Sequence, residues 1–144
     1  MDVRKFALIS GAVYVVVGIL GFVPAALQAP AADAPPLAVD ASYGYLLGLF
    51  PVNLVHNLVH LAVGVAGLVA SRAFGAARKY AVSLAVLYGV LTVLGVIPGL
   101  RTLFGLAPLF GHDIWLHALT AVAAGYFASR PAAGVETATI RRAA

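Results

Sequence analysis

Cysteine is absent from this chain of 144 residues, and charged residues are scarce. The absence of cysteine excludes disulfide bonds, thiolate metal ligands and thiol catalysis. Charged residues make up 10% of the chain and hydrophobic residues 62%, whereas ordinary soluble domains carry about 25% charged residues. A soluble chain of this size could not bury so much apolar surface in a single core, so the composition indicates a membrane protein with lipid as its solvent.

Basic residues outnumber acidic ones, nine to five, which gives a formal net charge of +4. They form no cluster interleaved with aromatic side chains, which is the pattern of a nucleic-acid-binding surface. The charge pattern therefore argues against nucleic acid as a partner and leaves the lipid bilayer as the expected one.

Four apolar runs are candidates for membrane-spanning helices, 6–27, 52–70, 80–100 and 114–128. The first and third have the length of about 20 residues that a bilayer requires, and the other two are near the lower limit. The first run follows Arg4 and Lys5 and has some features of a signal peptide. Its length and its similarity to the third run favour a helix that is retained.

The positions of lysine and arginine predict the orientation of these helices. Arg101 lies after the third run, whereas all the other basic residues lie before the first run, between the second and third, or after the fourth; they are Arg4, Lys5, Arg72, Arg78, Lys79, Arg130, Arg141 and Arg142. The positive-inside rule places both termini in the cytoplasm and the segment 28–46 outside. The tail, 131–144, is expected to be disordered.

Two stretches of the chain occur twice. Residues 4–7 (RKFA) recur at 78–81 (RKYA), an offset of 74, and residues 47–51 (LGLFP) match 104–108 (FGLAP) at an offset of 57. Internal repeats decide the architecture of a chain. The pattern predicts an all-α fold, an integral membrane four-helix bundle built from a duplicated two-helix unit.

The second and fourth runs each carry a polar pair near their start. His56 and His60 form one pair, Asp113 and His117 form the other, and the offset of 57 aligns the two pairs. Residues at i and i+4 share one helix face. Ionisable residues within a span are costly and normally face a partner or a cavity. We therefore expect all four to face the bundle interior near its extracytoplasmic end.

Three imidazoles and one carboxylate suit a transition metal ion such as zinc, iron or copper. Four such ligands would complete a tetrahedral site. Asn53 and Asn57 are available to hydrogen-bond to the ligands, although Asn53 is most simply the N-cap of its helix.

Several alternatives to a metal site stay open. Haem could be held between His60 and His117 as axial ligands. Asp113 could pair with His56 or His60 in a hydrogen-bonded cluster that only fixes helix packing, or it could cap the fourth helix. A proton pathway is disfavoured because no second ionisable site lies deeper in the membrane.

Catalysis has little support in the sequence, and no catalytic residue is predicted. The serines have no nearby histidine on the same helix face, so no nucleophile and base are paired. Tyr14 and Tyr88 occupy equivalent positions within their runs, and we expect them to form hydrogen bonds between helices. If the polar cluster serves packing alone, the chain is a structural or accessory subunit of a larger membrane complex. Small residues at every fourth position of the second and fourth runs leave a homo-oligomer open as well.

Residues 46–60 (LLGLFPVNLVHNLVH) and 111–117 (GHDIWLH) resemble the motifs of a family of small bacterial membrane proteins, catalogued as domain of unknown function 4383. The similarity extends from about residue 4 to residue 128. It implies a four-span protein of a bacterial envelope, hence of the inner membrane, and no established activity. The motif positions of that family that are present here are Asn53, His56, Asn57, His60, Asp113 and His117.

Overall fold

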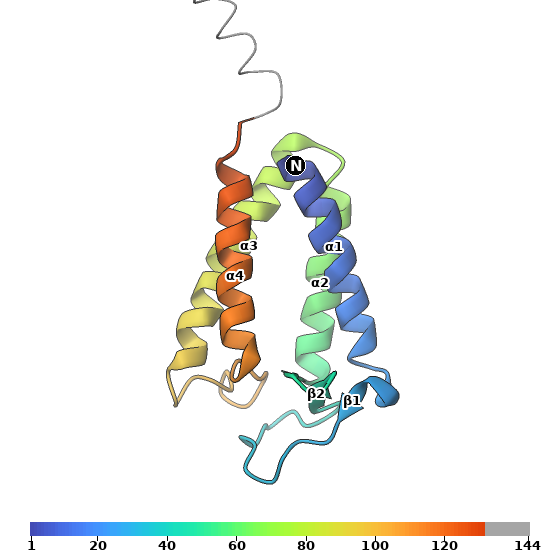
Figure 1. Ribbon diagram of the computed structural model, residues 1–144, viewed down its shortest axis with the longest axis vertical. Coiled ribbons are helices and arrows are strands. Elements are labelled where there is room, and N and C mark those ends of the chain that lie inside the picture. The colour runs from blue at the N-terminus through green and yellow to red at the C-terminus, as the bar shows by residue number, and fades with distance from the viewer. Residues whose placement is uncertain (132–144) are drawn as a thin grey trace, which may run out of the picture.

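A computed structural model describes residues 1–131 of the chain. Within them the chain forms four α-helices, α1 Val3–Leu20, α2 Leu54–Ala70, α3 Phe74–Val96 and α4 His112–Ser129 (Figure 1). The connection between α1 and α2 carries a short 3-10 helix, Pro24–Ala26, and three strands, β1 Leu27–Gln28, β2 Gly44–Leu46 and β3 Phe50–Val52. The fold is mostly helical, as predicted, with a small sheet that the sequence pattern did not predict.

The helices differ in length from the predicted apolar runs, and proline explains two of the differences. α1 ends at Leu20 and not near residue 27, because Pro24 lacks an N–H group and begins the separate 3-10 helix. α3 starts at Phe74, ahead of its apolar run, and ends at Val96, two residues before Pro98. The predicted disordered tail lies outside the described residues, apart from Pro131.

α1 packs against α2 and α3 packs against α4, so the chain forms two helical hairpins. Glycine residues allow the first pair to approach closely. A Cβ atom built on Gly11 would lie 2.7 Å from the backbone nitrogen of Leu68, and one on Gly64 would lie 2.6 Å from that of Val15. Small residues at such contacts let the backbones of membrane helices meet directly.

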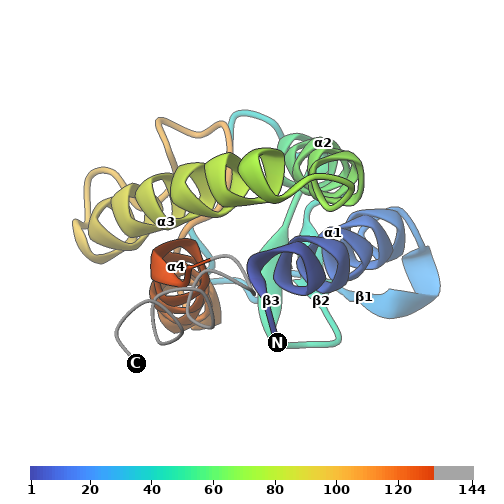
Figure 2. The same cartoon turned by 90° about the horizontal axis from the view of Figure 1, so that it is seen from above.

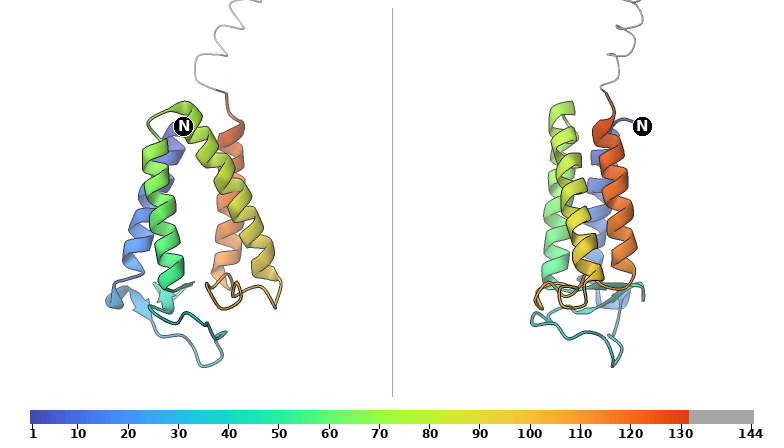
Figure 3. Two further views of the ribbon diagram at one scale, coloured as in Figure 1. Left: turned by 180° about the vertical axis from the view of Figure 1, so that it is seen from behind. Right: turned by 90° about the vertical axis from the view of Figure 1, so that its left-hand side faces the viewer.

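The N-terminus, the turn between α2 and α3 and the end of α4 all lie at one end of the bundle (Figure 1). Seen along the bundle, α1 and α3 occupy one diagonal and α2 and α4 the other (Figure 2). α1 also packs against α3, where Tyr14 and Tyr88 stack with ring centroids 5.6 Å apart. α2 and α3 separate toward the end of the bundle that carries the strands (Figure 3).

The three strands form an antiparallel sheet in the order β1-β2-β3. Leu27 pairs with Leu46 and Gly44 with Val52. Pro51 lies in β3, an outer strand in which a missing N–H group is tolerated. Gly48 in the turn between β2 and β3 has φ of 73°, a conformation that glycine adopts at no steric cost. The predicted external segment is therefore tied into a sheet at its two ends.

The two hairpins make corresponding contacts at the end that holds the N-terminus. Arg4 Nε donates to the carbonyl oxygen of Ser71 at 2.9 Å, and Arg78 Nε donates to that of Ala128 at 3.0 Å. Each arginine satisfies a carbonyl group that the end of a neighbouring helix leaves unpaired. Arg78 follows Arg4 by 74 residues and Ala128 follows Ser71 by 57, and these are the two offsets of the sequence repeat.

Apolar side chains cover the outside of the helices. α1 and α3 are long and apolar enough to cross a bilayer, and α2 is apolar but shorter, with 17 residues. Soluble monomers rarely expose large continuous apolar patches. Exposed large hydrophobic residues occur on every helix and include Leu8, Val13 and Val16 on α1, Leu58 and Val65 on α2, Val86 and Val93 on α3, and Leu119 and Val122 on α4.

We expect Gly11→Ala to lower the unfolding free energy of the detergent-solubilised protein by about 1–3 kcal/mol, as overpacking does in well-packed cores. The added methyl group would meet backbone atoms of α2, which cannot move away without separating the two helices. Gly89→Ala is the matched control, because no atom lies within 4 Å of its Cβ position and alanine favours a helix. Equal SDS unfolding midpoints for the two variants would contradict this packing.

Candidate metal centre

Asn53 fixes the start of α2 and thereby the direction of the side chains that follow it. Its Oδ1 accepts a hydrogen bond from the backbone N–H of His56 at 3.0 Å, which confirms the predicted N-cap. His56, Asn57 and His60 follow within two turns, and all three side chains are buried. The polar face of α2 is thus directed into the protein.

α4 presents Asp113 and His117 in a similar way. The helix follows Gly111, which has φ of 66° and occupies the N-cap position without a side-chain hydrogen bond. The alternative that Asp113 caps this helix is therefore wrong. Asp113 and His117 are both buried. His112 lies on the exposed surface instead, where its Nδ1 accepts a hydrogen bond from Trp115 Nε1 at 2.9 Å.

Three of the four predicted ligands meet between α2 and α4. His56, Asp113 and His117 each offer one ligand atom, and these atoms all lie within 4.8 Å of one another. His56 Nδ1 is 3.8 Å from Asp113 Oδ2. His60 is not a member of this group, but its ring centroid lies 4.4 Å from that of His56. These three residues could hold a metal ion, for which the usual ligand distance is about 2.0–2.2 Å.

Several buried polar atoms in and beside this cluster lack hydrogen-bond partners. Leaving a buried polar atom unpaired costs about 1–3 kcal/mol, and the great majority of such atoms in proteins are paired. Among residues 1–131, the buried side-chain atoms without a partner are His56 Nδ1, Asn57 Oδ1, His60 Nδ1, Asp113 Oδ2 and His117 Nδ1. The cluster therefore offers several unsatisfied groups to a ligand.

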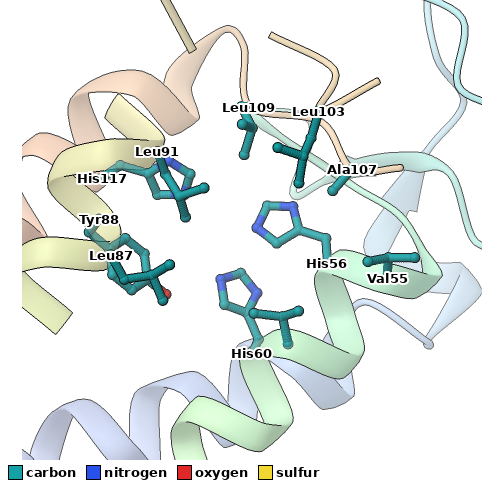
Figure 4. A pocket seen from close by; sticks show the side chains of 11 residues that line it. Val55, His56, His60, Leu87, Tyr88, Leu91, Leu103, Ala107, Leu109 and His117 are labelled. Carbon is teal, nitrogen blue, oxygen red and sulfur yellow. The ribbon is translucent and has the colours of Figure 1, made fainter. Parts of the chain in front are cut away.

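A cavity of about 170 Å³ lies beside the cluster (Figure 4). His56, His60 and His117 line it together with Tyr88. The rest of its wall is apolar and consists of Val55, Val59, Leu87, Leu91, Leu103, Ala107 and Leu109. Asp113 is not part of the wall, so a ligand in the cavity meets the imidazole rings first.

Comparison with known proteins identifies the family. The family model described as Domain of unknown function (DUF4383) matches residues 4–129. This chain belongs to that family. The matched range contains the whole polar cluster, and the resemblance found in the sequence motifs is confirmed. No curated protein and no solved structure matches the chain, so evidence on function comes from the geometry of the site.

In this DUF4383 protein the two asparagines hold the backbone around the cluster. Asn53 Nδ2 donates to the carbonyl oxygens of Val39 and Leu106, at 2.8 Å in both cases. Asn57 Nδ2 donates to the carbonyl oxygen of Gly21 at 2.7 Å. These hydrogen bonds go to backbone groups, so the amides position α2 and the connecting segments, whereas the sequence suggested that they support the ligands directly.

Two tyrosines border the cluster on the side toward the bundle centre. Tyr14 stacks on His60 with ring centroids 5.4 Å apart, and Tyr88 meets His117 edge-on at 5.1 Å. Tyr14 Oη also forms a long hydrogen bond of 3.5 Å to Thr120 Oγ1. The sequence predicted the hydrogen bond of Tyr14 but not the contacts of the two tyrosines with histidine. The offset of 74 relates Tyr14 to Tyr88, and the offset of 57 relates His60 to His117. These offsets were the sequence signal for the two tyrosine–histidine contacts.

We expect Asn53→Asp to lower the unfolding free energy by about 2 kcal/mol, since two partly buried hydrogen bonds are lost, each at the lower end of the range of about 1–3 kcal/mol. The carboxylate keeps the N-cap acceptor but cannot donate to Val39 or Leu106. The segment 29–43 should also be cleaved faster in limited proteolysis. Asp40→Asn, at an exposed position in the same segment, is the control and should behave like the wild type. Wild-type stability of Asn53→Asp would be inconsistent with the described network.

Proposed function

We propose that this DUF4383 protein is an integral membrane protein that binds a transition metal ion near the extracytoplasmic face. His56, Asp113 and His117 are the ligands that lie closest together, and His60 beside them is the fourth. The observation that carries the proposal is the set of buried, unpaired imidazole and carboxylate atoms that face one another across α2 and α4. Zinc, iron and copper suit such ligands.

The membrane location is supported by the apolar exterior of all four helices and by the distribution of charge. Four spans in the inner membrane would place the N-terminus, the turn between α2 and α3 and the end of α4 in the cytoplasm. The basic residues at that end, within the described part of the chain, are Arg4, Lys5, Arg72, Arg78, Lys79 and Arg130. Arg101 follows α3 at the opposite end.

An origin by duplication of a two-helix unit is supported by the backbone as well as by the sequence. Leu47 and Gly48 have φ of 54° and 73°, and Phe104 and Gly105, 57 positions later, have φ of 57° and 85°. A positive φ is uncommon for a residue other than glycine. A non-glycine residue with positive φ at both Leu47 and Phe104, one repeat offset apart, is what a duplicated loop would show.

The unpaired atoms favour metal binding over a cluster that serves packing alone. A buried ion pair stabilises a fold only when its geometry is good and its remaining hydrogen bonds are made. His56 and Asp113 are 3.8 Å apart, beyond hydrogen-bond distance, and both atoms are unpaired. An accessory role in a larger membrane complex, or a homo-oligomer, stays a prediction.

The volume of the cavity favours an ion over haem, the alternative proposed for His60 and His117. Pockets for organic ligands of cofactor size measure about 300–1,000 Å³. The cavity that both histidines line measures about 170 Å³. Haem would require α2 and α4 to move apart, and a Soret band in the purified protein would be its signature.

Protein purified in detergent should bind one equivalent of Zn²⁺, measured by elemental analysis after equilibrium dialysis. His117→Gln and Asp113→Asn should each weaken zinc binding by about 100-fold or more, because loss of a partner that merely supports a ligand already costs about 10–100-fold. His112→Gln is the matched control, since this exposed histidine contacts Trp115 outside the cluster. Zinc binding that is equal in the wild type and in His117→Gln rules out the proposed site.

The proposed orientation can be tested with single-cysteine variants, because the natural chain has no cysteine. In intact cells a membrane-impermeant maleimide should label Asp33→Cys, in the segment between β1 and β2, and should not label Gly75→Cys, near the start of α3. Gly75 has free space around its Cβ position, so both variants should react after the cells are lysed. The opposite labelling in intact cells would reverse the orientation.

A further inference from the structure

The cavity beside the cluster is open on the lateral surface of the bundle. α2 and α3 separate toward this end (Figure 3). Val59 on α2 and Leu87 on α3 both line the cavity, yet they are 43% and 40% exposed. Because both residues lie within helices, the opening faces the side of the bundle, where lipid chains lie in the proposed orientation.

His56, His60, His117 and Tyr88 supply the polar atoms of a wall that is otherwise apolar, and the wall carries no fixed positive charge. His56, His60 and His117 are each more than nine-tenths buried, and the Nδ1 atom of each lacks a hydrogen-bond partner. Among the described residues that line the cavity there is no lysine or arginine. A buried carboxylate or phosphate headgroup would therefore have no counter-charge. A neutral headgroup with carbonyl or hydroxyl oxygens fits better, since imidazole both donates and accepts hydrogen bonds.

The volume of the cavity sets the size of this headgroup. An engineered apolar cavity of about 150 Å³ in another protein holds one benzene molecule. The cavity described here measures about 170 Å³, which is room for a single six-membered ring. An apolar chain attached to that ring would leave through the opening between Val59 and Leu87, both of which are apolar.

From these features we infer that the cavity binds a neutral, lipid-dissolved quinone or quinol that enters between α2 and α3. Its ring oxygens would hydrogen-bond to the imidazoles of His56 and His60 on one wall (Figure 4), and its apolar tail would extend past Val59 and Leu87 into the lipid. The inference goes beyond the metal site. It shares the imidazoles of His56 and His60 with the proposed metal ligands, but hydrogen bonds from a quinone to these rings do not require an ion.

Binding of decylubiquinone to the full-length protein in lipid nanodiscs tests this inference. We expect saturable binding of one molecule per chain by equilibrium dialysis. The same dimethoxy-methyl-benzoquinone ring without its tail should bind at least tenfold more weakly. Leu87→Trp should fill the opening and reduce the affinity for decylubiquinone at least tenfold.

Val86→Trp is the matched control for Leu87→Trp. Val86 is the neighbouring residue on α3, is 63% exposed and does not line the cavity, so this variant should bind decylubiquinone like the wild type. Neither variant changes a proposed metal ligand, and wild-type zinc binding by each would confirm that the cluster is intact. Absence of saturable binding to the wild type, or unchanged affinity in Leu87→Trp, overturns the inference.

Zinc measurements on the same samples separate this inference from the proposed metal site. Quinone binding by a protein that binds no zinc would overturn the metal proposal alone. Zinc binding without quinone binding would overturn the quinone proposal alone.

Discussion

The packing of α1 against α3 determines where the polar side chains meet. Tyr14 and Tyr88 stack across this diagonal, which leaves α2 and α4 on opposite sides of the bundle. Side chains from these two helices nevertheless meet, with His56 Nδ1 3.8 Å from Asp113 Oδ2. Each tyrosine also contacts a histidine, at 5.4 Å for His60 and 5.1 Å for His117. The four rings thus form one chain of contacts in the order His60, Tyr14, Tyr88 and His117, and both of its ends are candidate metal ligands.

The helices and the inward direction of the polar residues could be predicted because both depend on short-range periodicity. His56 and His60 share a face through the helical repeat alone, and the offset of 57 relates them to Asp113 and His117. The prediction that all four bind one ion was harder to make from periodicity. Periodicity places residues four apart on one helix face, but it does not fix which side-chain atoms come within ligand distance. Asp113 and His117 both belong to the closest group, whereas His56 belongs to it without His60.

The sheet and the role of Asn53 could not be predicted, because each depends on segments that are distant in sequence. Two-residue and three-residue strands carry too little alternation to be recognised. Asn53 joins α2 to Val39 and Leu106, and nothing near Asn53 in the sequence marks either carbonyl group as its partner. Several buried polar atoms of the histidine–aspartate cluster lack hydrogen-bond partners, which disfavours the fold. Such unfavourable features concentrate at functional sites.

The short turn between α2 and α3 has a mechanical consequence. The two helices are joined at residues 71–73, and the distance between them increases toward the other end of the bundle (Figure 3). With 23 residues, α3 is about 35 Å long, so a tilt of about 5° at the turn displaces its far end by about 3 Å. If the helices span a bilayer as proposed, a change in its thickness or lateral pressure would alter the helix spacing most around the histidines and least around the Arg4–Ser71 contact.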